Sequence, residues 1–410
     1  MDNITHTLIG ILVGETAARF APAAQSQIPQ EERRKLFVGV MAVGSNLPDL
    51  DFLYSFFTGN KLDYLLQHRG YTHTIVGAVC MALLMFAACE IWLRRRAMPP
   101  ARNDRLWLGS IAVLAPLLHI AMDFTNSYGV HPFWPFYNGW LYGDSVFIVE
   151  PLFWAAAAPL VFLLRTVLAR ALVGLVLAAG VVLSFGAGMV PTSLAIALVL
   201  LTLIMLALGR YVPARAALLA GVGAWLACTV MFATAGRAAA KEIAAIAQQD
   251  FTSEQTLDRV LTPTPVNPLC WEVILVQSRN AHYVLRRGLV SLAPRWIAAD
   301  HCPSRTMQDS VTSPLTTTQA ANTASVRWHG EALLSKQELQ HFAAAYCQAA
   351  DLLRFARAPF FAKRGADWIL GDLRYDREDG LGFAEILLDE RNRCPSFVPD
   401  WQPPRIDLLN

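Results

Sequence analysis

The chain has 410 residues, of which 54% are hydrophobic and only 16% are charged. Its formal net charge of +2 argues against a nucleic-acid-binding protein, because no dense basic face is available to neutralise phosphates. The charge is also uneven: residues 1–240 hold 28 charged residues and residues 241–410 hold 38. The first part therefore has the composition of a membrane-embedded region, and the second that of a soluble region.

The chain begins with two apolar segments that are short for a membrane crossing, residues 4–20 and 36–50. We expect short helices packed against longer ones, or elements that enter half of the membrane. The first segment is not a signal peptide, because it lacks a basic start and is interrupted by His6 and Glu15.

Six later segments approach the roughly 20 mainly apolar residues that a spanning helix requires. They are residues 72–93, 106–124, about 148–165, 168–187, 190–208 and 214–236. We therefore predict six transmembrane helices, or eight if both short segments also cross.

Lys and Arg gather in alternate loops of this first part. The basic loops contain Arg19, Arg33, Arg34 and Lys35, then Arg94, Arg95, Arg96, Arg102 and Arg105, then Arg165 and Arg170, then Arg210 and Arg215. Loops 125–147 and 186–190 contain neither residue type, and Lys61 and Arg69 are the exceptions to the alternation. Because basic loops stay in the cytoplasm, we predict that the other loops and the region after residue 237 face the periplasm.

The polar second part has mixed secondary-structure signals. We predict a linker at 262–268, strands within 271–279, 282–292, 366–376 and 381–389, and a helix at 335–356 that begins at a Ser335 cap. Its four cysteines are Cys270, Cys302, Cys347 and Cys394. An even number would allow two disulfides in an oxidising periplasm, and four free thiols are the alternative.

These patterns predict a mainly α protein, a polytopic transmembrane helical bundle followed by a small C-terminal α+β soluble domain. We divide the chain into residues 1–150, a helical domain with polar candidates for a site, residues 151–236, additional membrane helices, and residues 237–410, the soluble domain. The soluble domain shows no catalytic arrangement in its sequence.

Polar residues occur within the apolar part. His119 and Asp123 are four residues apart in an apolar segment and share one face of a helix. An ionisable residue in a membrane helix is costly, and it therefore suggests a function. The plainer alternative is a buried His–Asp pair that only ties helices together.

The predicted topology brings several such side chains to one membrane face. They are His6, Asp49, Asp51, His73, His119 and Asp123, and the loop residues His68, His131 and Asp144 lie on the same face. Imidazoles and carboxylates without thiolates suit zinc first, with manganese or iron as alternatives, and the number of ligands allows one to three ions.

The stretch 46–73 delivers several of these residues. Pro48 interrupts the helix and exposes Asp49 and Asp51. We expect one of the two aspartates to bind metal and the other to orient a histidine, and we favour Asp51 as the ligand.

The remaining polar residues of that stretch and the loop after Asp123 have more than one interpretation. His68 could be a ligand, a general acid or neither, and Arg69 could bind a phosphate oxygen through its forked donors or face lipid headgroups. The aromatic-rich loop 128–151 is either an interfacial belt or a lid over the site. Asp144 and Glu150 could be additional ligands or helix caps.

Five motifs resemble the inner-membrane metal-dependent hydrolase family of YdjM- and YfhP-like proteins. They are "MDNITHTLIG", "GSNLPDLDFL", "HRGYTHTIVG", "LLHIAMDFTNSYG" and "GDSVFIVEP", within residues 1–155. The order of His6, Asp51, His73, His119 and Asp123 is also distantly similar to zinc-dependent phospholipase C, which implies that these five residues bind the metal. The chain departs from that pattern because no clear His-x-x-x-Glu follows Asp123.

The resemblance implies a membrane-bound hydrolase in which a metal-activated water attacks a phosphoester. We expect Asp49, His68 and Arg69 to assist catalysis, and a lipid or lipid-linked headgroup at the outer face of the bacterial inner membrane to be the substrate. The alternative is a non-enzymatic scaffold or metal-binding protein whose periplasmic domain binds a protein partner. Cation transport is disfavoured, because no acidic residue lies between Glu150 and Glu242.

Overall fold

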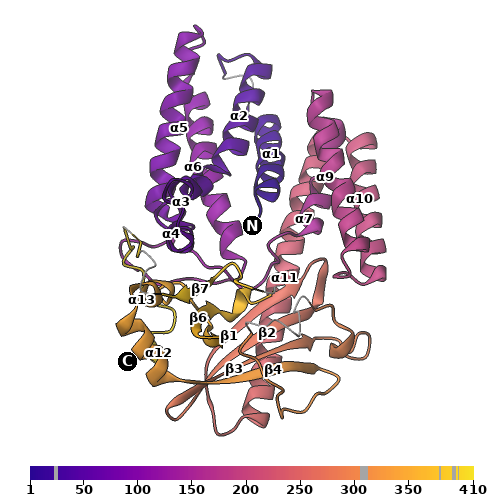
Figure 1. Ribbon diagram of the computed structural model, residues 1–410. Helices are drawn as coiled ribbons and strands as arrows, with labels where there is room; N and C mark the ends of the chain where they lie inside the picture. Colours follow the sequence, from indigo (N-terminus) through magenta and orange to yellow (C-terminus); the bar gives the residue numbers. More distant parts are fainter. Residues whose placement is uncertain (23–25, 305–312, 378–379, 390–393, 396) are drawn as a thin grey trace.

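The computed structural model describes all residues except 23–25, 305–312, 378–379, 390–393 and 396. It shows a bundle of roughly parallel and antiparallel helices, with a domain of antiparallel sheets and short helices covering one end of the bundle (Figure 1). The predicted fold class is confirmed.

The first group of helices carries the polar stretch. It consists of α1 (Asn3–Phe20), α2 (Gln30–Gly44), η1 (Leu47–Asp51), α3 (Phe52–Thr58), α4 (Lys61–Gln67), η2 (Tyr71–His73), α5 (Ile75–Arg95) and α6 (Arg102–Phe124), where η denotes a 3₁₀ helix. Helices α1 and α2 pack so closely that a Cβ atom at Gly10 would lie only 2.8 Å from the Met41 carbonyl oxygen. Only glycine permits that approach.

The second group comprises α7 (Pro151–Ala156), α8 (Leu160–Leu163), α9 (Val167–Gly186), α10 (Thr192–Tyr211) and α11 (Ala214–Asp250). The prediction of a spanning helix at about 148–165 is wrong, because this segment forms the two short helices α7 and α8. Pro159, which has no backbone N–H to continue a helix, stands directly before α8. Every residue of α7 is buried, and α7 packs against α9, α10 and α11.

Within the described residues, five helices are long and apolar enough to cross a membrane: α5, α6, α9, α10 and α11. A sixth crossing would be the broken pair formed by α2 and residues Leu47–Thr58, which meet at an angle of 47°. The short segments expected at 4–20 and 36–50 correspond to α1 and to this broken pair.

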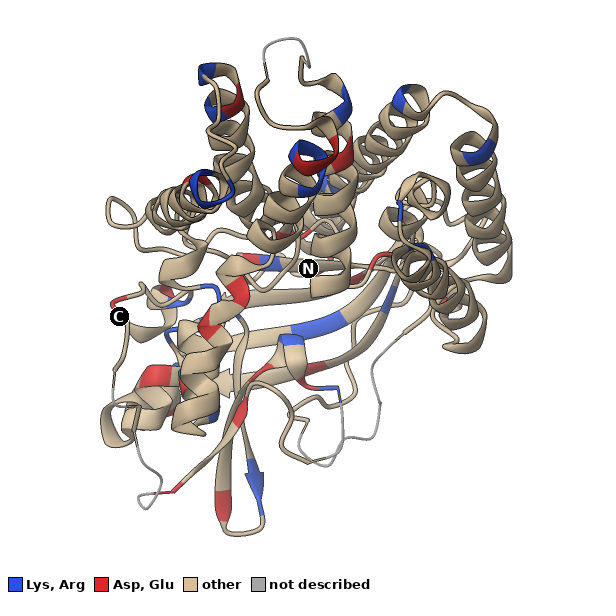
Figure 2. Ribbon diagram, turned by 90° about the horizontal axis from the view of Figure 1, so that it is seen from above, with Lys and Arg blue, Asp and Glu red and all other residues tan. Residues whose placement is uncertain are grey.

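The basic turns lie together at the end of the bundle that points away from the sheets (Figure 1). The Arg215 guanidinium donates to the carbonyl oxygen of Arg19 at 3.1 Å, and Arg165 lies 2.9 Å from Glu31. Figure 2, which views the molecule from above, shows Lys and Arg on the helix turns there. The bundle therefore separates a basic end from an end that contacts the C-terminal domain.

The C-terminal domain contains two antiparallel sheets. The first has the order β1 (Gln255–Thr264), β2 (Asn267–Arg279), β3 (His282–Ser291) and β4 (Val326–Ser335), and the second β5 (Pro359–Arg364), β6 (Asp367–Asp372) and β7 (Glu385–Leu388). The helices are α12 (Lys336–Ala345), α13 (Cys347–Leu352) and α14 (Ile406–Leu409), with the short turns η3 (Ala299–His301) and η4 (Leu373–Tyr375).

The start of α12, its end and the turn between β1 and β2 are three local features that the sequence patterns addressed. The Ser335 cap is confirmed, since its hydroxyl accepts from the Glu338 N–H, but the helix predicted at 335–356 is broken at Tyr346. The predicted linker at 262–268 is wrong: the segment forms the end of β1, a two-residue turn at 265–266 and the start of β2, and Val266 has a φ of 62°.

The four cysteines of this domain form two disulfides. Cys270 pairs with Cys302, and Cys347 pairs with Cys394. The prediction that these thiols are oxidised is therefore confirmed in the structure.

Buried polar contacts join the domain to the bundle. Arg357 from the domain lies 2.8 Å from Asp144 of the bundle and 2.7 Å from Asp258 of β1. Glu150, directly before α7, accepts from the Val266 N–H in the β1–β2 turn. Among the described residues, neither Asp144 nor Glu150 belongs to a group of candidate metal ligands, and both make contacts at this junction.

Glu150 should make the junction sensitive to pH. Burial raises its pKa from 4.5 to about 7, although backbone N–H groups of Leu152 and Val266 favour the ionised form. The folded state therefore holds this proton more tightly than the unfolded chain, and the stabilisation is present below pH 4.5 and lost as pH rises through about 7. We predict that the free energy of unfolding falls by on the order of 3 kcal/mol across that window.

Thermal unfolding in detergent at about pH 5 and about pH 8 would measure this effect. Glu150→Gln should remove most of the difference in melting temperature, whereas Asp300→Asn, at a side chain that is 60% exposed, should leave it in place. An unchanged difference in Glu150→Gln would contradict the prediction.

Candidate metal centre

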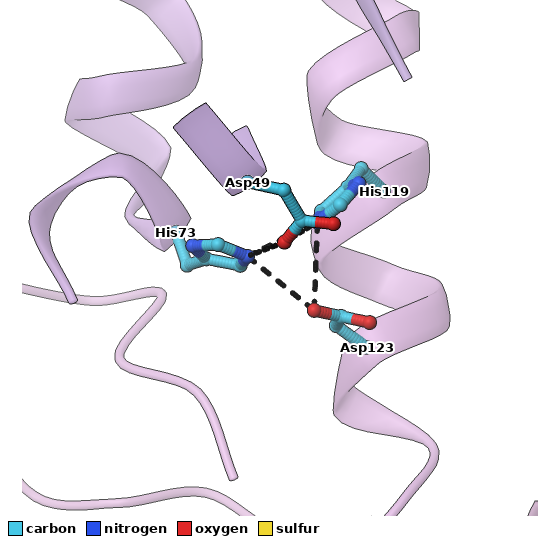
Figure 3. A group of neighbouring side chains, drawn as sticks. All are labelled: Asp49, His73, His119 and Asp123. Carbon is cyan, nitrogen blue, oxygen red and sulfur yellow. Dashed lines mark hydrogen bonds and ion pairs between the residues drawn. The ribbon is translucent and has the colours of Figure 1, made fainter. Parts of the chain in front are cut away.

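Four side chains from three elements converge inside the bundle (Figure 3). We call Asp49 of η1, His73 of η2, and His119 and Asp123 of α6 the donor cluster. The two Nε2 atoms of His73 and His119 lie 3.0 Å apart. Each lies 3.4 Å from Asp49 Oδ1, and their distances to Asp123 Oδ2 are 3.3 and 3.4 Å.

These distances fit a divalent metal ion. In a tetrahedral zinc site with ligand bonds of about 2.0–2.1 Å, neighbouring ligand atoms lie about 3.3 Å apart. The five distances of the donor cluster, 3.0–3.4 Å, match that spacing. All four residues are buried, none more than 6% exposed. Two carboxylates and two facing imidazole nitrogens in such a place are well suited to a shared cation.

The neighbours of the two histidines leave Nε2 directed at the cluster. His119 Nδ1 lies 2.7 Å from the carbonyl oxygen of Ser45, to which it can only donate. His73 Nδ1 lies 3.2 Å from Asp51 Oδ2. A proton on Nδ1 leaves the Nε2 lone pair free for a metal, and such outer contacts orient metal-binding histidines in many proteins.

The two aspartates of "LPDLD" face different partners. Residues two apart in a 3₁₀ helix point in directions about 120° apart, because the helix has about three residues per turn. Asp49 therefore faces the donor cluster, and Asp51, which we favoured as the ligand, lies on the far side of His73. Asp51 Oδ1 is 2.9 Å from His68 Nδ1, and Oδ2 accepts from the Arg69 N–H at 2.9 Å.

Asp51 still has a route to a metal. Together with Asp49 and His68 it forms a second group whose ligand atoms lie within 4.8 Å of one another. This group shares Asp49 with the donor cluster, so a second ion would sit beside the first. The residues thus fit one ion in the donor cluster and allow a neighbouring one.

His6 lies beside the donor cluster. Its ring stacks on His119 with centroids 3.8 Å apart, and its Nε2 is 3.1 Å from Asp123 Oδ1. The amino group of Met1 contacts the same oxygen. His6 therefore contacts the outer oxygen of Asp123, while Oδ2 faces the two cluster histidines.

Arg69 is buried beside the donor cluster. Its side chain is 2% exposed, with Nε 2.9 Å from Asp123 Oδ2, and it donates to Asn126 Oδ1 at 2.7 Å. Its guanidinium also lies over the Tyr128 ring, 4.7 Å from the centroid. The backbone takes a φ of 62° here, a conformation that non-glycine residues adopt only when surrounding contacts hold it.

One of those contacts comes from His131, a loop residue to which we assigned no specific role from the sequence. Its ring lies 3.2 Å from the Arg69 carbonyl oxygen through Nδ1 and stacks on Trp401 at 3.9 Å. Burial lowers the pKa of His131 to about 3, so the ring is neutral and Nδ1 can donate. Asn126 was also missed, and its position just after the His119–Asp123 helix was the available signal.

A pocket of about 560 Å³ leads to the cluster. Asp49, His68 and Arg69 line one side of it, and Tyr64 and Tyr128 belong to its walls. Among the described residues that line it, Asp49 is the one that also belongs to the donor cluster. A ligand in this pocket would therefore meet the cluster at Asp49, with Arg69 next to it.

Comparison with known proteins places these residues in a family. A family model described as YdjM inner membrane protein matches residues 1–207, about half of the chain. The chain belongs to the YdjM inner membrane protein family. The whole donor cluster, with His6, Asp51, His68 and Arg69, lies inside the part matched by the YdjM model.

The chain is also similar to the uncharacterized protein YfhP of Bacillus subtilis (strain 168). The two are 29% identical over 141 residues, which cover 34% of this chain and 39% of YfhP. The similarity thus spans about two fifths of that relative's length. No solved structure matches the chain.

Metal content tests the donor cluster of this YdjM family member. Purified protein should bind zinc, His119→Ala should lose it, and Asp51→Asn should bind it about 10–100-fold more weakly, because Asp51 orients His73 from outside the cluster. Elemental analysis after equilibration with buffered zinc measures both.

The matched control is His341→Ala, at an exposed position on α12. Equal metal content in wild-type protein and His119→Ala would remove the cluster as a metal site.

Proposed function

We propose that this chain is a membrane-bound metal-dependent hydrolase, a phosphoesterase that acts on a lipid or lipid-linked headgroup. The observation that carries the proposal is the buried donor cluster at the end of a pocket that Arg69 also lines. A bound divalent ion would supply an activated water and polarise a phosphoryl oxygen.

The surrounding residues have distinct roles in this proposal. Asp49, His73, His119 and Asp123 hold the metal. Arg69 places a permanent positive charge next to Asp123 at the pocket wall, where it would favour an anionic phosphate.

His68 is suited to proton transfer. Its Nδ1 lies 2.9 Å from Asp51, which fixes the ring and leaves Nε2 available to a ligand in the pocket. A histidine held in this way by a carboxylate can exchange a proton with a reacting group. The leaving alcohol of a phosphoester needs such a proton.

A lipid substrate is supported by the surface near the pocket. Phe52 and Ile148 line the pocket and are 44% exposed. On the same short helix α3, Phe56 and Phe57 are 74% and 82% exposed. Exposed aromatic side chains of this density are typical of a membrane contact, so the pocket would open where headgroups lie.

We further propose that the pocket and the C-terminal domain face the periplasm. The basic turns occupy the opposite end of the bundle, which favours a cytoplasmic position for that end. The two disulfides, Cys270–Cys302 and Cys347–Cys394, suit an oxidising compartment.

An alkaline phosphatase reporter tests this orientation, because it is active only in the periplasm. Fused after Asn410, it should be active in cells, and fused within the basic loop after Met98 it should be inactive. The reverse pattern would show that the site faces the cytoplasm.

Turnover is tested with zinc-loaded protein and vesicles of phosphatidylethanolamine or phosphatidylglycerol, with released phosphate esters followed by ³¹P NMR. We expect release by the wild-type protein and a loss of about 10²–10⁴-fold in His68→Gln, the range typical of a proton-transferring group. His68→Gln should keep the metal of the donor cluster.

The control for this assay is again His341→Ala, which should match the wild type. Bound metal without release above the His119→Ala background, on either lipid, would count against a lipid phosphoesterase and favour a metal-binding or scaffold role.

A further inference from the structure

The walls of the pocket come from both parts of the chain. Tyr64 and Tyr128 belong to the N-terminal part, whereas Tyr375 and Phe383 belong to the C-terminal domain, and all four line the pocket. The Phe383 ring lies 5.7 Å from Tyr64 and 5.1 Å from Tyr375, centroid to centroid. Tyr375 in turn lies 6.2 Å from Tyr128. We call these four rings the aromatic wall.

Buried polar contacts fix the C-terminal half of this wall. Arg374, next to Tyr375, is 2% exposed and pairs with Asp372 at 2.7 Å. Its guanidinium also donates to the carbonyl oxygens of Ser127 and Tyr128 in the loop after α6. Breaking these contacts would leave a buried charge unpaired, so η4 is held against the loop that carries Tyr128.

The aromatic wall and the donor cluster differ in their relation to the family. The family match ends at residue 207, so the cluster lies inside it, and Tyr375 and Phe383 lie beyond it. The metal-binding residues are thus part of the matched region, whereas half of the aromatic wall comes from the remainder of the chain. In such a pocket the reacting phosphate of a ligand would lie at the donor cluster, and the rest of the ligand would lie against the aromatic wall.

We propose that Tyr375 and Phe383 are specificity-determining residues that bind the organic substituent of a phosphoester. The inference rests on the proposed function, in which the donor cluster and Arg69 hold the phosphate. Ring faces next to that phosphate favour an apolar or ring-bearing substituent through burial and stacking. Inorganic phosphate would gain nothing from this wall.

The wall provides a discrimination that the metal does not. A metal and an arginine bind any phosphate group, because they recognise its charge and oxygens. Rings positioned beside them add affinity only for a ligand that carries a carbon substituent of sufficient size. The C-terminal domain would therefore select among phosphoesters while leaving the chemistry at the metal unchanged.

Non-hydrolysable phosphonates separate these two contributions. Calorimetric titration of zinc-loaded, full-length protein with methylphosphonate and benzylphosphonate gives the affinity for each. We expect the wild type to bind benzylphosphonate about tenfold more tightly than methylphosphonate. Tyr375→Leu and Phe383→Ala should each reduce this preference about fivefold, with methylphosphonate binding unchanged.

The variants are chosen to preserve the fold. Tyr375→Leu keeps an apolar side chain at the junction but removes the ring face, and Phe383 is already 37% exposed. Trp296→Ala is the matched control, because this aromatic residue of the same domain is 85% exposed and does not line the pocket. It should bind both phosphonates as the wild type does.

The outcomes distinguish the inference from the function on which it rests. Equal affinity of the wild type for both phosphonates, or a preference that survives in both variants, would overturn the role of the aromatic wall alone. Equal weakening of both ligands in the variants would show that Tyr375 and Phe383 position the site without selecting substrates. Failure of both phosphonates to bind the zinc-loaded protein would overturn the phosphoester site itself.

Discussion

Asp123 is a carboxylate buried in an apolar helix bundle, and the arrangement of the N-terminal part follows from the need to compensate its charge. A buried carboxylate is strongly unfavourable unless opposite charges or hydrogen-bond donors surround it. Arg69, His73, His119 and His6 all contact it, and they come from α1, the 68–73 turn and α6. Distant segments of the chain therefore meet at this one side chain.

The interruptions in the helices are what make that meeting possible. A continuous α2–α3 helix would carry Asp49 and Asp51 past the cluster, but the bend after Gly44 and the 3₁₀ turn at Pro48 hold both beside it. In the same way, His73 lies in a turn just before α5, where Thr74 caps the helix. The non-helical backbone at these breaks is tolerated because the surrounding protein satisfies its polar groups.

The C-terminal domain contributes side chains to the ligand pocket and none to the donor cluster. It contacts the bundle through the ion pair of Arg357 with Asp144 and through hydrogen bonds that Arg374 donates to the carbonyl oxygens of Ser127 and Tyr128. Those contacts bring two of its rings into a pocket whose other end is the donor cluster. Chemistry and recognition would thus be assigned to different parts of one chain, with the junction setting their spacing.

Local sequence patterns were sufficient to predict the features that depend on neighbouring residues. Hydrophobic length located α5, α6, α9, α10 and α11, and the spacing of His119 and Asp123 placed both on one helix face. The cap at Ser335 and the basic composition of each loop could be predicted for the same reason, since each depends on a few neighbouring residues.

Tertiary structure decided whatever depends on contacts between distant residues. The choice between Asp49 and Asp51 follows from which side of a short 3₁₀ turn faces α6, and both residues have the same chemistry. The turn at Val266 is held by a distant residue, because Glu150 accepts from the Val266 N–H. Tyr375 and Phe383 reach the pocket only because the domain docks beside Tyr128, more than 200 residues earlier in the chain, and no local pattern records that approach.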